Sequence, residues 1–203
     1  MKLGLALGSG GARGLAHIPY IEVLDELGAR PACVSGASIG SIIGALYAGG
    51  MSGAAMRSLA LSISLADLPR LIDLSGPRDA GIIKGRKIEE WLESVLPARR
   101  FEDLEIPLRI VAADFRRGEM VVFESGDLVP AIRASISIPG AFEPYERDGR
   151  LLVDGGVVNP VPIDLLPGAD FVVGIDVSGD RGGEEALSEK PNRLDILLGT
   201  YDI

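Results

Sequence analysis

Two kinds of apolar pattern alternate along the chain, and each predicts its own type of element. Short apolar runs bounded by glycine, proline or charged residues indicate strands at residues 2–7, 31–35, 108–113, 119–123, 151–153 and 171–176. Apolar positions at helical spacing predict helices over 15–27, 38–48, 87–96 and 128–135. Residues 51–83, which include Pro69 and Pro77, predict irregular structure. This alternation is typical of an α/β domain with a mainly parallel central sheet.

Length and composition fit a single globular domain over residues 1–203. The chain is 47% hydrophobic and 24% charged, which is ordinary for a folded protein of this size. The acidic stretch 179–190 predicts a loop. The helical pattern that starts at 193–198 stops with the sequence, which indicates a domain truncated at its C-terminus.

Charge and cysteine content narrow the functional classes. The formal net charge of −9 argues against nucleic-acid binding, because that function needs a basic surface. One cysteine, Cys33, and one histidine, His17, supply neither an internal disulfide nor the ligands of a structural zinc site. The apolar N-terminal segment lacks a signal-peptide cleavage site. The uncharged residues 31–56 are long enough for a transmembrane helix, but they are mostly small. We therefore expect a cytoplasmic protein without a signal peptide, a transmembrane helix or a bound metal.

The first candidate for chemistry is the segment Gly8-Ser9-Gly10-Gly11-Ala12-Arg13-Gly14, which lies between a predicted strand and a predicted helix. Arg13 breaks the glycine spacing of a dinucleotide-binding loop, and the Gly-Lys-Ser/Thr end of a P-loop is missing. Glycines here allow several backbone N–H groups to converge on an anion at the start of a helix. A tight turn without a ligand is the alternative.

The second candidate is Gly36-Ala37-Ser38-Ile39-Gly40, the only G-x-S-x-G segment in the chain. This spacing suits a sharp turn between a strand and a helix, where glycines leave room for close packing and the serine oxygen points outward. The position of the segment between a predicted strand and a predicted helix favours Ser38 as a nucleophile. Small residues for helix packing are the other interpretation.

A nucleophilic serine needs a base, and His17 fits poorly. No histidine follows Ser38 and no aspartate precedes His17, which excludes the chain orders of α/β-hydrolases and subtilisins. A chymotrypsin-like order would need His17, Asp25 and Ser38 and lacks any supporting context. We interpret His17 as a packing or supporting residue.

The third candidate supplies a carboxylate instead. Asp154-Gly155-Gly156 follows a short predicted strand, and the two glycines allow close backbone approach beside the aspartate. A buried Asp154 that bonds directly to Ser38 would be adapted to act as a base. An aspartate that only closes a turn is the alternative.

Four segments in this order resemble the bacterial patatin-like phospholipases: LALGSGGARGLAH, SGASIGSIIGALYAGG, RASISIPGAFEP and LVDGGVVNPVPID. The resemblance implies a three-layer α/β/α fold and a Ser–Asp dyad of Ser38 and Asp154. It places the oxyanion hole at Gly10, Gly11 and Ala12. The positions implied to support this site are Gly8, Arg13, Gly14, Gly36, Gly40, Gly155 and Gly156. The implied substrates are phospholipids, lysophospholipids or other fatty-acyl esters, with no cofactor.

Several alternatives stay open at this point. A general carboxylesterase or thioesterase would share the dyad, and a non-catalytic lipid-binding module would share the fold. Arg13 either braces the glycine loop or attracts an anionic headgroup. Residues 62–83 either pack in the core or form a flap over an acyl-chain groove. The adjacent Lys84, Arg86 and Lys87 suit a solvated helix start or transient contact with the inner membrane face.

Overall fold

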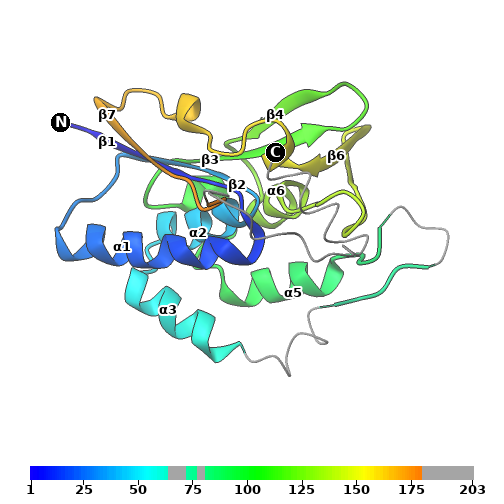
Figure 1. Cartoon of the computed structure of the whole chain (residues 1–203), viewed down its shortest axis with the longest axis horizontal. Helices are drawn as coiled ribbons and strands as arrows, with labels where there is room; N and C mark the ends of the chain where they lie inside the picture. Colours follow the sequence, from blue (N-terminus) through cyan, green and yellow to red (C-terminus); the bar gives the residue numbers. More distant parts are fainter. Residues whose placement is uncertain (64–71, 77–80, 180–203) are drawn as a thin grey trace.

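A seven-stranded mixed sheet forms the centre of the computed structural model, which describes residues 1–63, 72–76 and 81–179 (Figure 1). The strand order is β5-β6-β3-β2-β1-β7, and β4 also pairs with β3. The strands are β1 (Leu3–Leu7), β2 (Cys33–Ala37), β3 (Leu108–Asp114), β4 (Glu119–Phe123), β5 (Tyr145–Arg147), β6 (Arg150–Asp154) and β7 (Phe171–Ile175).

Strands β7, β1, β2 and β3 are parallel to one another. Antiparallel pairing begins at β3, which binds β4 and β6, and β5 in turn pairs antiparallel with β6. The mostly parallel sheet with helices confirms the predicted α/β class. The short strand β5 was absent from the sequence-based prediction.

One face of the sheet carries the main core. Helices α2 (Ile39–Ala48) and α6 (Leu128–Ser135) pack directly on the strands, and α1 (His17–Glu26) lies beside α2. Helix α3 (Gly53–Ser62) packs on α1, and α5 (Arg86–Val95) packs on α6, so these two lie farther from the sheet (Figure 1). Alternate strand residues point into this core, among them Leu5, Leu7, Val34 and Ile110.

The opposite face is lined by small residues because the chain between β6 and β7 passes close to it. This segment contains two short 3-10 turns, Gly155–Val157 and Ile163–Leu165. A Cβ at Gly4 would lie only 2.9 Å from that of Ala169, and Ala6 and Cys33 pack against Leu166. Cys33 is buried at this face.

The expectation of irregular structure over residues 51–83 was wrong for α3. The helix begins after Ser52, whose hydroxyl accepts a hydrogen bond from the backbone N–H of Ala55 at 3.3 Å. Residues 64–71 and 77–80 of that stretch lie outside the described residues, as do residues 180–190 of the expected acidic loop and the helix expected over 193–198. The helix predicted over 15–27 is α1 from His17 onward, and its first two residues belong to a preceding 3-10 segment, Gly11–Ala16.

None of the helices described here combines the length and the apolar character required to cross a bilayer. The uncharged stretch 31–56 divides into β2, α2 and the start of α3.

Gly40 lies where α2 passes closest to the sheet. A Cβ added there would lie 2.1 Å from the carbonyl oxygen of Leu7 and 2.8 Å from that of Gly8. Both oxygens are fixed in the backbone, so the contact between α2 and β1 requires a glycine.

We expect Gly40→Ala to lower the free energy of unfolding by about 3 kcal/mol, since a methyl group would force the helix away from the strand. Gly44→Ala in the same helix is the matched control. Its Cβ would meet only side-chain methyl groups, the nearest being the flexible Cδ1 of Leu108 at 3.2 Å, and alanine favours the helix by about 1 kcal/mol. Urea denaturation measures both variants. Equal losses would contradict the requirement for glycine at position 40.

Candidate active site

Ser38 occupies a strained turn between β2 and α2. Its backbone angles are φ 53° and ψ −126°, in a region that residues other than glycine rarely adopt. Gly36 and Gly40 make the turn possible, because a Cβ at Gly36 would lie 2.4 Å from the carbonyl oxygen of Gly40. Ser38 is the last residue before the helix, which therefore begins one residue later than predicted.

Asp154 reaches Ser38 because two strands share one edge of β3. β2 pairs with β3 as far as Ala37, which lies opposite Val111. β6 pairs with β3 from the next position onward, with Asp154 opposite Ala112. The end of β2 therefore meets the end of β6. The hydroxyl of Ser38 donates a hydrogen bond to Oδ2 of Asp154 at 2.6 Å.

The Asp154 carboxylate is almost completely buried, with 1% of the residue exposed. Burial raises its pKa to about 7, and hydrogen bonds from Ser38 and from the backbone N–H of Gly156 oppose this rise. The Gly156 bond to Oδ1 measures 2.7 Å. Gly155 passes so close to β3 that a Cβ would lie 2.2 Å from the carbonyl oxygen of Val111. Both glycines thus shape the surroundings of the carboxylate.

The C-terminal end of α6 holds both members of the pair. The backbone N–H of Ser38 donates to Oγ of Ser135 at 2.9 Å, and the backbone N–H of Asp154 donates to the carbonyl oxygen of Ser137 at 2.9 Å. The amide of Ser38 is therefore already bonded and is not a free donor to a substrate.

A buried arginine fixes this end of α6. Arg133 is 2% exposed and donates to Oγ of Ser137 at 2.6 Å. Its other terminal nitrogen donates to the carbonyl oxygens of Lys84 at 2.5 Å and Glu143 at 3.0 Å. Sequence reasoning missed Arg133 and Ser135 as individual contributors. The available signal was a charged residue and two serines among the apolar positions of the 128–138 segment.

The glycine loop borders the same region from the other side. Gly10 and Gly11 have positive φ values of 155° and 54°. The N–H groups of Gly11 and Ala12 begin the 3-10 segment and so have no acceptor within it. The loop is anchored at Gly8, whose N–H donates to the carbonyl of Ile175 at 3.0 Å.

Two further residues tie this loop to its neighbours. A Cβ at Gly14 would lie 2.2 Å from Cγ2 of Ile39, so the loop passes directly over the first turn of α2. The guanidinium of Arg13 donates to the carbonyl oxygen of Ser178 at 2.5 Å, a contact that ties the loop to the segment after β7.

His17 supports the glycine loop, and the hydrogen bond of its ring goes to Gly8 and not to Ser38. Its Nε2 lies 2.8 Å from the carbonyl oxygen of Gly8, and a carbonyl can only accept, so Nε2 carries the proton. Burial lowers the pKa of His17 and favours the neutral ring. Asp25 accepts a hydrogen bond from the N–H of Gly53 between α1 and α3. The chymotrypsin-like arrangement of His17, Asp25 and Ser38 is therefore not assembled.

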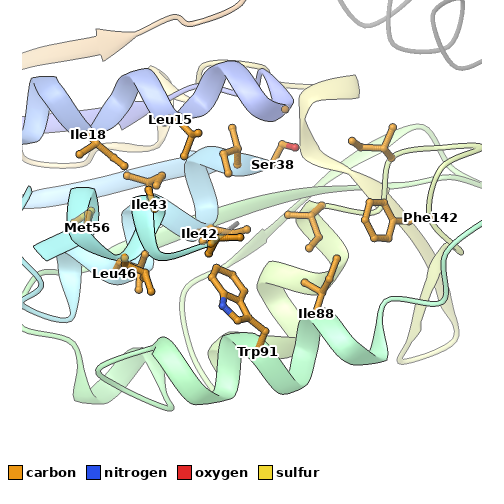
Figure 2. A pocket seen from close by; sticks show the side chains of 17 residues that line it. Leu15, Ile18, Ser38, Ile42, Ile43, Leu46, Met56, Ile88, Trp91 and Phe142 are labelled. Atoms are coloured by element: carbon orange, nitrogen blue, oxygen red, sulfur yellow. The ribbon is translucent and has the colours of Figure 1, made fainter. Parts of the chain in front are cut away.

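An apolar groove opens beside the Ser38 hydroxyl (Figure 2). Its volume is about 290 Å³, and apart from Ser38 and Gly11 its walls are side chains of apolar residues. They come from α2, α3, α5 and the segments around them, and include Leu15, Ile42, Leu46, Met56, Trp91 and Phe142. Ile63 also lines the groove, whereas Leu65, Leu68 and Leu71 of the expected flap lie outside the described residues. Such a groove suits a hydrocarbon chain.

Among the described residues, no three acidic, histidine or cysteine side chains gather in a way that would hold a metal ion. The polar groups near Ser38 are instead a carboxylate and backbone amides. This combination suits acyl transfer by a serine, in which a base accepts a proton and N–H donors face an oxyanion.

Comparison with known proteins gives consistent matches. A family model described as patatin-like phospholipase matches residues 5–167. The uncharacterized NTE family protein Rv1063c of Mycobacterium tuberculosis is 39% identical over 193 residues, which cover 94% of this chain and 53% of that protein. Patatin-like phospholipase domain-containing protein 6 of Homo sapiens is 35% identical over 182 residues, which cover 86% of this chain and 13% of that protein.

Among solved structures, VipD of Legionella pneumophila has the same fold. Its TM-score is 0.65 at 16% sequence identity, over 77% of this chain and 46% of that chain. The chain spans about half the length of the mycobacterial relative and a smaller share of the human one.

The pKa of Asp154 predicts a pH-dependent stability. The unfolded carboxyl loses its proton near pH 4, whereas the folded one keeps it to about pH 7. The stabilisation by this protonated group is therefore complete below pH 4 and is lost as the pH rises to about 7. We expect the free energy of unfolding of Asp154→Asn, relative to that of wild type, to increase by roughly a few kcal/mol as the pH rises through this window.

Urea denaturation between pH 4 and 8 measures the free energy of unfolding of both proteins. In the difference between the two values, the contributions of the other titrating groups cancel. Ser38→Ala provides a second check. Removal of the hydroxyl that stabilises the carboxylate should extend the window to higher pH. A difference between wild type and Asp154→Asn that stays constant over the whole range would contradict the raised pKa.

Proposed function

The chain belongs to the patatin-like phospholipase family, and on this premise we propose that it is a serine acyl hydrolase that cleaves fatty-acyl esters of lipids. The reaction would be of the phospholipase or lysophospholipase type. The observation that carries this proposal is the 2.6 Å hydrogen bond from Ser38 to a buried Asp154 at the head of an apolar groove.

In the first half of the proposed reaction, Ser38 attacks the ester carbonyl carbon. Asp154 accepts the hydroxyl proton through the hydrogen bond already present. The C–O bond to the alcohol then breaks, and the alcohol leaves with the proton that Asp154 returns. The acyl group remains on Oγ of Ser38 as an ester.

The second half repeats these steps with water. Asp154 accepts a proton from a water molecule, whose oxygen attacks the acyl ester. The bond to Oγ of Ser38 breaks, the proton returns to Ser38, and a fatty acid is released. No step calls for a metal or an organic cofactor.

The oxyanion formed in each half needs N–H donors. The amide of Ser38 is bonded to Ser135, so we assign this role to the glycine loop, at Gly10, Gly11 and Ala12. Gly11 borders the groove beside Ser38, which supports this choice. One such donor contributes roughly 3–4 kcal/mol to the transition state in other enzymes.

The groove favours a fatty-acyl ester over a small polar ester. Its walls are almost entirely apolar and begin at Ser38 itself, so an acyl chain would lie along them while its carbonyl reaches the hydroxyl. A general carboxylesterase or thioesterase would act equally on short and long acyl groups. A lipid-binding module would hold the chain without hydrolysis.

We expect Ser38→Ala to lower kcat for a p-nitrophenyl ester by at least about 10⁴-fold and Asp154→Asn by about 10²–10⁴-fold. Ser35→Ala is the matched control. Ser35 is also fully buried, and its hydroxyl donates to the carbonyl of Pro162 at 2.7 Å. It lies on the face of β2 that is turned away from the groove. Its loss should lower stability without a comparable loss of kcat.

These rates are compared only among variants that circular dichroism finds folded. Retained activity in Asp154→Asn would refute the base assignment. An inactive but folded wild type that binds fatty acids would point to a lipid-binding module instead.

The raised pKa of Asp154 predicts the pH profile of the reaction. The base must be ionised to accept a proton, so kcat/KM should rise with pH and level off above an apparent pKa of about 7. A soluble short-chain ester assayed from pH 5 to 9 measures this, with thermal unfolding at each pH as the check on folding. A profile that is flat from pH 5 to 8 would contradict it.

A further inference from the structure

We propose that Leu46 and Met56 close the inner end of the apolar groove and thereby set the length of acyl chain that the site binds, at about ten carbons. The inference rests on the proposed function in one respect, because it takes the acyl carbonyl to lie at Ser38. It goes beyond that function by naming the chain length and the side chains that determine it.

Helix α2 forms the floor of the groove and gives it a direction. Ile39, Ile42, Ile43 and Leu46 follow helical spacing along one side of α2, and all four line the groove. The seven steps from Ile39 to Leu46 extend roughly 10 Å along the helix axis. Figure 2 shows Ser38 near one end of this row, and Leu46 and Met56 together at the other.

The two ends of the groove differ in exposure. Leu46 and Met56 are only 2% and 1% exposed, whereas Leu15, close to Ser38, is 52% exposed. A chain that enters beside Ser38 therefore runs toward a closed end, where Leu46 and Met56 are backed by the rest of the core.

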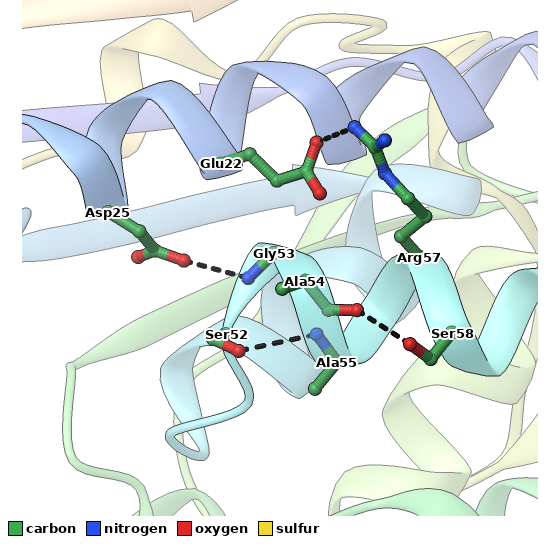
Figure 3. Close-up of polar contacts among 8 residues, drawn as sticks. All are labelled: Glu22, Asp25, Ser52, Gly53, Ala54, Ala55, Arg57 and Ser58. Carbon is green, nitrogen blue, oxygen red and sulfur yellow. Dashed lines mark hydrogen bonds and ion pairs between the residues drawn. The ribbon is translucent and has the colours of Figure 1, made fainter.

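The closed end is also held firmly, because Met56 lies in the first turns of α3, where this helix is attached to α1 (Figure 3). The N–H of Gly53 donates to Oδ2 of Asp25 at 2.7 Å, and Arg57 forms an ion pair with Glu22. A Cβ at Gly53 would lie 2.7 Å from the backbone nitrogen of Glu22, so the two helices are in direct contact.

The length of the groove gives its capacity. Carbon–carbon bonds of about 1.5 Å advance an extended acyl chain by roughly 1.3 Å per carbon. The row of roughly 10 Å from Ile39 to Leu46 therefore accommodates on the order of eight to ten carbons. Carbons beyond that number remain outside and gain nothing from this groove. We therefore expect selectivity among acyl chains to be confined to the first ten or so positions.

Hydrolysis of p-nitrophenyl esters with 4 to 16 acyl carbons tests this. In wild type, kcat/KM should rise about fourfold per methylene and stop rising near ten carbons. Met56→Ala and Leu46→Ala should move this limit to longer chains by two or more carbons. Ala60→Leu, which adds bulk to the groove wall without leaving a cavity, should move it to shorter chains.

Met51→Ala is the matched control, since Met51 packs against the same core but does not line the groove. It should leave the limit unchanged. The inference is overturned if folded Met56→Ala, Leu46→Ala and Ala60→Leu all keep the wild-type limit, or if wild type shows no limit up to 16 carbons.

A binding measurement separates this inference from the proposed function. Calorimetric titration of Ser38→Ala with fatty acids of 6 to 16 carbons needs no hydrolysis. Affinity that stops rising near ten carbons would support the groove even if wild type hydrolyses no ester. Affinity that keeps rising to 16 carbons would overturn the chain-length limit, whatever the esters show. Failure to bind a fatty acid of any length would overturn the groove as an acyl site.

Discussion

The placement of β2 and β6 along one edge of β3 is the constraint on which the site depends. β2 brings Ala37 opposite Val111, and β6 brings Asp154 opposite the very next residue. The C-terminal ends of the two strands, which run in opposite directions, therefore lie next to each other. A serine at one end and a carboxylate at the other form a pair whose separation is set by the backbone ladder, which is stiffer than any loop.

This placement carries a cost that the surrounding structure offsets. Ser38 adopts an unfavourable backbone conformation, and Asp154 is a carboxyl group with almost no access to water. Ser135 and Ser137 bind the two backbone amides, and the buried Arg133 holds Ser137 through its side chain. The end of α6 and the residues directly after it thus hold both Ser38 and Asp154 in place. Since the buried carboxyl has a pKa of about 7, the same burial that costs stability makes Asp154 a stronger base.

The sequence predicted the parts of the site whose signals are local. Ser38 directly follows β2, Asp154 is the last residue of β6, and both lie beside glycines that allow close contact with the neighbouring backbone. Ser135 was out of reach because its partner Ser38 lies 97 residues away. Helix α3 was missed because its stability depends on contacts with α1, such as the hydrogen bond between Asp25 and Gly53, which no local pattern in its own sequence reveals.

In the proposed reaction, helix α2 connects the nucleophile Ser38 with the groove that would bind the acyl chain. Its N-terminus fixes Ser38, and one side of the same helix forms the floor of the groove as far as Leu46. Gly40 allows this helix to pack against β1, and α1 lies beside it. The distance from the hydroxyl to the closed end is therefore a property of one rigid helix. The contacts that bind the acyl chain of a substrate along α2 would also place its ester carbonyl at Ser38. The binding energy of the acyl chain would then serve to orient the reacting group.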